Sequence, residues 1–246
     1  RVSRLGSTIC EQRQSRELSS SHWNRAQLVR LKVIALSLIK MRFVDINPTS
    51  DIEFGSFNNK KMSICLNECM KPVKFQIPRM YMPFGISGFT PEVGATKYNI
   101  DFSMKGWDEE GGYVKKFYNF VKDVEDNLIS EVVKQSPEIM GAQMSAQEIK
   151  SMLNSNIKQG TDRDPKFRLK VGPESRIFDV NDTDVTCPLE HGLYSKHSGV
   201  AMVEMNGVYF LNRMIGITWK LTQMKIYEPQ RLKGFQFQLE NNDADY

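Results

Sequence analysis

The sequence lacks the short motifs that carry catalytic groups in many enzyme families. It contains no G-x-x-x-x-G-K phosphate loop, no G-x-S-x-G nucleophile turn and no H-E-x-x-H zinc motif. Histidine is scarce, with three residues in 246. Glu190-His191 could pair with His197 as acid and base, but beside Pro188 and Gly192 we expect polar loop residues. We therefore predict that the chain is not an enzyme.

Cysteine is also scarce, and its spacing argues against a structural metal site. Only three of the four cysteines lie inside the expected mature domain, which does not match the disulfide framework of a secreted module and favours a reducing intracellular compartment. A Cys3His zinc site would use Cys65, Cys69, Cys187 and His191. A strand running through Cys65 and Cys69 would separate them by about 13 Å, so the site would need a turn at Asn67-Glu68. We expect unliganded thiols, and no metal or cofactor.

No apolar run is long enough to cross a membrane, since the stretch from Val33 to Ile39 ends at Lys40. The surrounding residues 1–42 are rich in arginine and serine and hold nine lysines and arginines against Glu11 and Glu17. Three interpretations of this segment are open: an organellar transit peptide, a secretory signal, or sequence translated upstream of a start at Met41. We favour the last alternative and expect residues 1–40 to be a disordered leader or non-native segment.

Alternating apolar residues predict strands over much of the chain. The pattern is present at Ile52/Phe54, Met62/Ile64/Leu66, Val73/Phe75/Ile77 and Tyr98/Ile100/Phe102/Met104, and returns at Phe167/Leu169/Val171 and Ile217/Trp219/Leu221. Proline and glycine interrupt residues 78–94, which we expect to be a long loop or a broken edge strand. Asn206-Gly207 supplies the positive φ angles of a tight turn and predicts a β-hairpin there.

Two helices are expected between the strand groups. Apolar residues recur every three or four positions from Val114 to Val133, which predicts an amphipathic helix that Pro137 ends. Ser145 followed by Glu148 forms a capping box that starts a second, shorter helix. The chain is therefore predicted to be mainly β (α+β), with an inserted amphipathic helix.

Cations and aromatic residues occur together in the strands, as single-stranded nucleic acid requires for phosphate contacts and base stacking. Lys166, Arg168 and Lys170 alternate with the apolar residues of one strand, so they should form a basic face. The other candidate binding residues are Arg79, Arg213, Lys220, Tyr81, Phe84 and Tyr209. Trp219 alternates with Ile217 and Leu221, so we expect it to be buried. A merely soluble sheet face is the alternative for the basic row.

The C-terminal run from Gly216 to Met224, the Asn-Gly hairpin, the inserted helix and the acidic tail ending in an aromatic residue together resemble one family. They are similar to the single-stranded DNA-binding proteins of nucleo-cytoplasmic large DNA viruses and, more distantly, to the replication single-strand binders of podophages. The likeness covers about residues 43–246. The order of the elements contributes as much to it as the individual letters.

This resemblance implies a non-catalytic OB-fold β-barrel over residues 41–236 that coats single-stranded DNA in replication, recombination and repair, often as a dimer. It also implies that residues 237–246 form a flexible tail that competes with DNA and binds a DNA polymerase or helicase. Glu240, Asp243, Asp245 and Tyr246 would fill that role. The expected location is intracellular, in the nucleus or at a cytoplasmic viral replication site, with an organelle as a further option.

Two other functions stay open. A β-rich structural or interaction protein of a viral particle would present the same basic face to a protein instead of DNA, because a barrel alone does not select a function. A metal-dependent nucleic-acid hydrolase would need converging carboxylates, whereas Asp179, Asp182 and Asp184 are expected to lie solvated on a loop.

Overall fold

The computed structural model describes residues 41–67 and 72–229. The predicted leader, residues 1–40, lies outside the described residues, as do Cys69 and the predicted tail. The hypotheses about those segments therefore stay predictions. Among the described residues no helix is both long enough and apolar enough to span a bilayer.

The sheet closes on itself as a barrel. The barrel strands are β4 (Val73–Gln76), β5 (Met80–Met82), β7 (Lys97–Ser103), β9 (Lys166–Phe178), β10 (His197–Leu211) and β11 (Met214–Tyr227). The ring runs β5, β7, β9, β11, β10 and back to β5, and β4 extends the β5 position along β10. The β9–β11 pair is parallel and the others are antiparallel. With β4 and β5 as the first strand, the ring order is 1-2-3-5-4, so the OB-type barrel expected from the sequence is confirmed.

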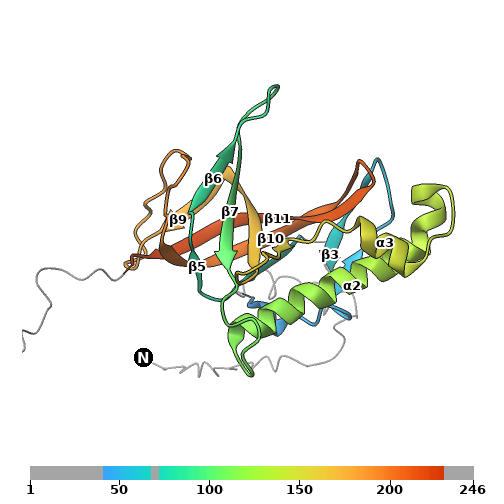
Figure 1. The fold of residues 1–246 in the computed structure, drawn as a ribbon, viewed down its shortest axis with the longest axis horizontal. Coiled ribbons are helices and arrows are strands. Elements are labelled where there is room, and N and C mark those ends of the chain that lie inside the picture. The colour runs from blue at the N-terminus through green and yellow to red at the C-terminus, as the bar shows by residue number, and fades with distance from the viewer. Residues whose placement is uncertain (1–40, 68–71, 230–246) are drawn as a thin grey trace, which may run out of the picture. The chain divides into compact units, whose positions relative to one another are not determined.

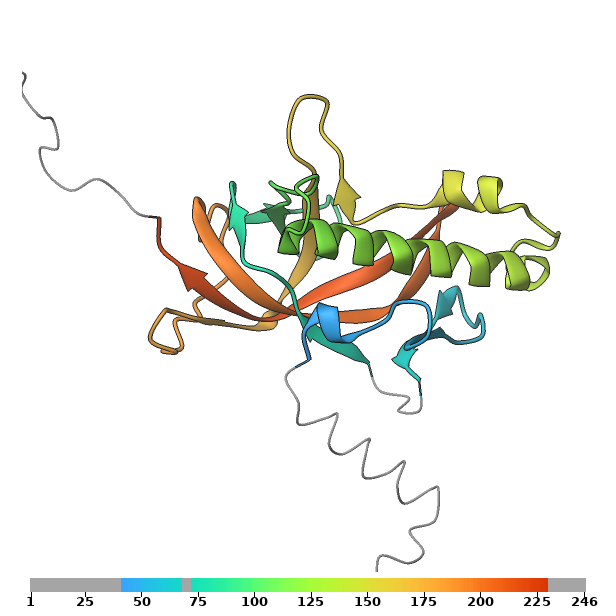
Figure 2. The same cartoon turned by 90° about the horizontal axis from the view of Figure 1, so that it is seen from below.

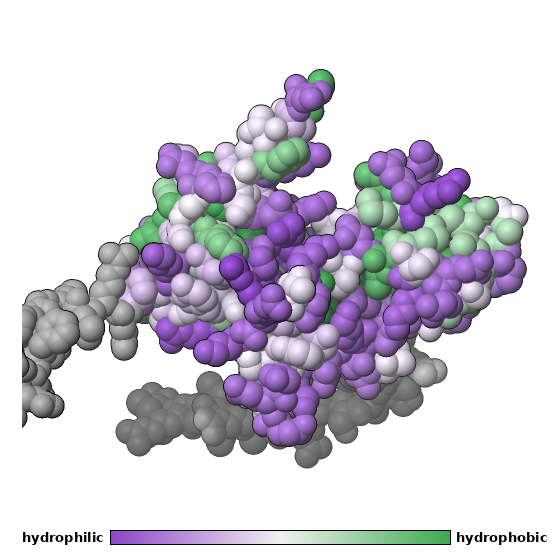
Figure 3. Space-filling model, in the orientation of Figure 1, coloured by the Kyte–Doolittle hydropathy of each residue, from purple (hydrophilic) through white to green (hydrophobic). Residues whose placement is uncertain are grey.

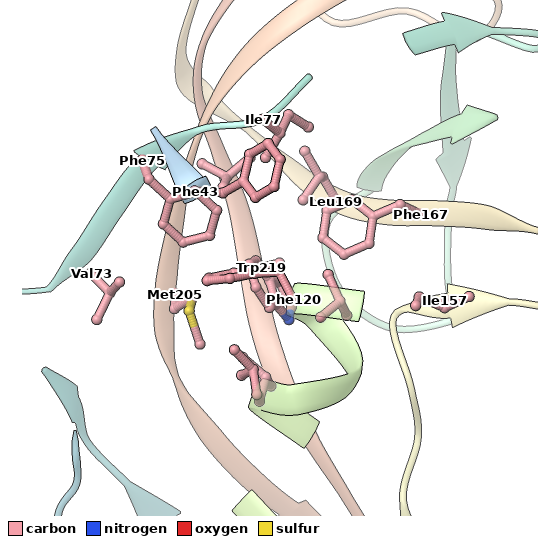
Figure 4. Close-up of a cluster of buried hydrophobic side chains, with 14 of the residues drawn as sticks. Phe43, Val73, Phe75, Ile77, Phe120, Ile157, Phe167, Leu169, Met205 and Trp219 are labelled. Carbon is pink, nitrogen blue, oxygen red and sulfur yellow. The ribbon is translucent and has the colours of Figure 1, made fainter. Parts of the chain in front are cut away.

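Alternation along the strands separates the barrel core from its surface. In β9 Phe167, Leu169 and Val171 are buried, while the intervening cations face outward. Trp219 of β11 is 1% exposed, as expected, and lies between two phenylalanine rings in Figure 4. Its ring meets Phe75 edge to face with the centroids 5.8 Å apart, and Phe167 with the centroids 5.2 Å apart.

Helix α2 (Tyr113–Met140) packs its predicted apolar face against this core and runs alongside the barrel (Figure 2). Phe120 contacts Phe75, and Phe117 contacts Phe167, both edge to face. The shorter helix α3 (Ala146–Met152) starts at Ser145, whose hydroxyl accepts the Glu148 N–H in the expected capping box. Both helices are thus inserted between β7 and β9, as the sequence predicts.

Pro137 does not end α2, contrary to the prediction, because the helix continues to Met140. A proline at this position leaves the carbonyl four residues earlier, that of Val133, without its helical N–H. Ser136 Oγ donates to that carbonyl at 2.8 Å, and Gln143 Nε2 donates to it at 3.0 Å. The helix ends instead at Gly141, whose φ of 78° is left-handed.

The prediction of a β-hairpin at Asn206-Gly207 is also wrong. These residues lie inside β10, where the register with β11 shifts between Met205 and Val208 and Gly207 takes a φ of 135°. The dipeptide therefore forms a bulge in one continuous strand. The chain turns at Asn212 and Arg213, which both have positive φ.

The remaining elements flank the barrel. They are η1 (Phe43–Asp45), β1 (Ile52–Phe54), β2 (Lys61–Met62), β3 (Ile64–Leu66), β6 (Ile86–Phe89) and β8 (Ile157–Lys158). β1 and β3 form a small separate sheet, while β2 and β8 extend the barrel sheet. The segment 78–94, expected to be a loop or broken edge strand, contains β5 and β6. β6 pairs with β7 in a hairpin that projects beyond the barrel (Figure 1).

Candidate nucleic-acid interface

The outer face of β7 and β9 carries a row of cations. Register places Lys166 beside Ser103, Arg168 beside Asp101 and Lys170 beside Asn99. The three β9 side chains that the sequence assigns to a basic face therefore lie together on the outside of the barrel. In OB folds the face of the second and third strands, here β7 and β9, is the one that binds oligonucleotides.

Asp101 holds two of these cations. It is 8% exposed and accepts from Arg168 Nε at 2.7 Å and from Nη2 at 2.9 Å, while Lys166 Nζ lies 3.6 Å away. The hydrogen bonds that Arg168 donates to Asp101 raise the pKa of Arg168 above its usual value. This bidentate pair fixes the guanidinium and lowers the net charge of the face. The sequence alone does not single out Asp101, because its partner is set by the register between two strands that are distant in the chain.

Positive charge is crowded at both ends of the row, at Lys170 and at Lys158, which pairs with Lys166. Burial, and then the nearby charge of Lys97, lower the pKa of Lys170. Burial, and then Arg168, lower the pKa of Lys158 in β8, a residue that the sequence did not single out. Cations close enough to lower the pKa of a neighbouring lysine create a local positive potential, which a bound phosphate would relieve.

Tyr209 joins the two ends of the row. Lys170 Nζ lies 5.8 Å from the centre of its ring, and Asn154 Nδ2 donates to its hydroxyl at 2.7 Å. The other side-chain atom of Asn154, Oδ1, accepts from Lys158 at 2.7 Å. Gly216 makes room for Tyr209, since a Cβ there would lie 2.5 Å from the tyrosine hydroxyl. Tyr209 is therefore half-buried, and its contacts help to position Lys170 and, through Asn154, Lys158.

Exposed aromatic rings lie beside Lys166, in a groove with a volume of about 570 Å³. Tyr81 of β5 and Phe84 are 46% and 48% exposed and line it together with Trp107. Lys166 Nζ is 5.0 Å from the centre of the Phe84 ring, and the loop 159–164 forms part of the wall. Figure 3 shows a mainly hydrophilic, hollowed surface between the β6–β7 hairpin and α3. We name the cation row and this groove the β7–β9 face.

Other candidate cations are paired or lie elsewhere. Lys220 is the β11 neighbour of Lys170, but it forms an ion pair with Glu174, and that hydrogen bond lowers the pKa of Glu174. Arg213 lies in the β10–β11 turn, seven residues from Lys220, which is about 23 Å of extended strand. Arg79 stacks on Tyr227 in a second groove. Only Lys220 of these three joins the β7–β9 face.

The residues that the rejected catalytic and metal-site alternatives would use make contacts within or beside loops. Asp184 pairs with Arg176, Asp182 pairs with Lys225 at 2.7 Å, and Asp179 accepts backbone N–H groups of its own loop. Cys187 Sγ lies 3.4 Å from the Tyr194 hydroxyl, and His191 Nδ1 accepts the Gly88 N–H. Within the described ranges no three His, Cys, Asp or Glu residues are grouped to hold a metal ion.

The sequence matches no protein-family model and no curated protein. Among solved structures, the fold is similar to the single-stranded DNA-binding protein gp2.5 of bacteriophage T7, with a TM-score of 0.44 and 10% identity over 68% of this chain and 92% of that chain. It is also similar to the single-stranded DNA-binding protein of bacteriophage Enc34 in complex with single-stranded DNA, with a TM-score of 0.39 and 13% identity over 74% and 98%. Similarities this low assign no function to any residue of this chain.

Proposed function

We propose that this chain binds single-stranded DNA on the β7–β9 face with little sequence preference. The observation that carries the proposal is the contact of Lys166 with Phe84 beside the exposed Tyr81, at one end of a cation row on an OB-type barrel. In this mechanism Lys97, Lys158, Lys166 and Lys170 neutralise phosphates while the exposed rings stack bases. Single strands are favoured because duplex bases are already stacked on one another.

Fluorescence anisotropy with a labelled oligo-dT tests this function. The full chain is titrated at low and moderate salt, with unlabelled duplex of matched length as competitor. Tight, salt-dependent binding that the duplex fails to displace supports the proposal. Absence of binding at low salt would remove it and favour the viral structural or interaction protein, whose basic face meets a protein.

We further propose that binding is the whole activity, without catalysis, and that it serves DNA replication, recombination and repair. The sequence resemblance supports these roles, as it supports an intracellular site of action, viral origin and a homodimer. A purified chain that leaves labelled single strands uncleaved in the presence of divalent cations would be consistent with a coating function. Cleavage would favour the metal-dependent hydrolase.

The aromatic residues of the groove give a prediction that separates stacking from charge. Phe84→Ala, or Tyr81→Ala, should lower the affinity for oligo-dT about tenfold, because one base–aromatic stack contributes about 1–3 kcal/mol. The salt dependence should not change, since no phosphate contact is lost. Tyr113→Ala is the matched control, because Tyr113 is an exposed ring at the start of α2 and lies outside the groove and the cation row. An equal loss in the control variant would contradict a specific stacking role.

The predicted tail gives a second test. If residues 237–246 compete with DNA for the β7–β9 face, deletion of these residues should raise the affinity for oligo-dT several-fold at low salt. The gain should shrink as salt rises, because screening weakens the attraction between tail and face. Titrations of both chains over a salt series measure it. Equal affinities at all salt concentrations would leave the tail only its proposed partner role toward a polymerase or helicase.

A further inference from the structure

A second groove adjoins the first. It has a volume of about 730 Å³ and is lined by residues of β5, of the end of β11 and of the loop that follows β9. Tyr81 lines both grooves. Its backbone pairs with Ser103 of β7 on one side and Ser198 of β10 on the other, so its position is fixed by the barrel. The two grooves therefore meet at one exposed aromatic ring.

In the second groove the guanidinium of Arg79 lies over the ring of Tyr227. The Arg79 guanidinium lies 3.9 Å from the centre of the Tyr227 ring, and its Nε donates to Ser198 Oγ at 2.9 Å. The stack and the hydrogen bond orient the guanidinium before any ligand arrives. Both arginine planes and aromatic rings are surfaces on which unpaired bases stack.

The charge in this groove differs from that of the β7–β9 face. Arg79 and Lys196 are opposed by Asp179 and Glu228, which line the same groove. Hydrogen bonds from the backbone of Thr183, and then of Asn181, lower the pKa of Asp179, so this carboxylate stays ionised at neutral pH. A balanced groove gains little from phosphates, whereas a planar cation on a ring suits a base.

We propose that a single strand long enough to leave the β7–β9 face crosses Tyr81 and places a base against the Arg79–Tyr227 stack. This extension rests on the proposed single-stranded DNA binding. It assigns the first groove to phosphates and bases together, and the second groove to base stacking. The binding site then has two parts, the β7–β9 face and the second groove, with Tyr81 between them.

A length series of oligo-dT from about 4 to about 16 nucleotides, the range of site sizes for one OB fold, tests the extension. Affinities are measured for the full wild-type chain, Arg79→Ala and Arg79→Lys. On the longest oligonucleotide both variants should bind about tenfold more weakly than wild type, because lysine keeps the charge but lacks the plane. On the shortest one all three should bind alike, and the salt dependence should be the same for all three chains.

The outcomes separate the extension from the function on which it rests. If the Arg79 variants lose the same affinity at every length, or lose none at any length, the second groove does not bind the strand. Wild-type binding would still support the β7–β9 face. Wild-type protein that binds neither length would overturn both. Phe84→Ala is the matched control, since its ring lines the first groove alone and its loss should weaken binding at every length. Arg79 is exposed, so both variants should keep the fold, which circular dichroism checks.

Discussion

Reversing two charges, Lys97→Glu with Lys170→Glu, should lower the affinity for oligo-dT about 100-fold at low salt. Each substitution removes a cation from the β7–β9 face and adds a repulsive carboxylate. Because each phosphate contact on a single strand contributes about 0.7 to the slope of log K against log salt, losing two should flatten that slope by about 1.4. Anisotropy titrations at several salt concentrations measure both quantities.

These two lysines are the right targets because they do not hold the fold together. Burial, and then the nearby charge of Lys97, lower the pKa of Lys170, so the double substitution exchanges one like-charged pair for another and breaks no ion pair among the described residues. Arg168→Glu would be a poorer choice, since it would bring a second carboxylate against the buried side chain of Asp101. Weaker binding in that variant could reflect a destabilised barrel instead of a lost phosphate contact.

The matched control is Lys116→Glu with Lys134→Glu, which changes the net charge by the same amount. Both lysines are exposed on α2, and Lys134 pairs with Glu131 of the same helix. If this variant loses as much affinity as the first, binding depends on overall charge and the β7–β9 face has no special part. If neither variant loses affinity, DNA does not bind to this face.

The sequence predicted well those elements whose residue pattern is compatible with only one local structure. In β9 the apolar side chains fill the barrel and the cations face outward, so a period of two fixes both faces. The apolar face of α2 and the capping box at Ser145 are equally local signals. Trp219 could be assigned to the core for the same reason, because it alternates with two aliphatic residues.

Asn206-Gly207 shows where a local signal has two solutions. The dipeptide predicts a positive φ, which a hairpin turn and a bulge satisfy equally well. The pairing of β10 with β11 continues on both sides of Gly207 and decides for the bulge. Asn212-Arg213, where the chain does turn, is a weaker turn signal because arginine seldom adopts a positive φ.

The site was only partly predictable because its contacts join strands far apart in the sequence. Lys166, Arg168 and Lys170 share one strand, so their common face follows from alternation. The ion pair of Asp101 with Arg168 depends on the register of β7 against β9. The contact of Lys170 with Tyr209 joins β9 to β10, and β11 lies between these two strands. Lys158 lies on a strand of two residues, which is too short to give any alternating pattern.

Trp219→Ala should have the largest effect on stability, lowering the free energy of unfolding by about 3–5 kcal/mol. The side chain is almost fully buried and packs edge to face against Phe75 and Phe167, which in turn contact α2. A cavity there would loosen the barrel and the helix together. Since small domains are stable by about 5–15 kcal/mol, this substitution alone should remove at least about a fifth of the stability. Urea denaturation followed by far-ultraviolet circular dichroism measures the loss.

Trp219→Phe provides the control that separates a core residue from a base-stacking one. Phenylalanine keeps much of the buried ring, so this variant should remain folded with a smaller loss of stability than Trp219→Ala. Because the ring at this position is almost fully buried and packs against Phe75 and Phe167, the affinity of the Trp219→Phe variant for oligo-dT should equal that of wild type. A folded Trp219→Phe protein with weakened binding would contradict the assignment of stacking to Tyr81 and Phe84, since β11 would then contribute to the DNA path.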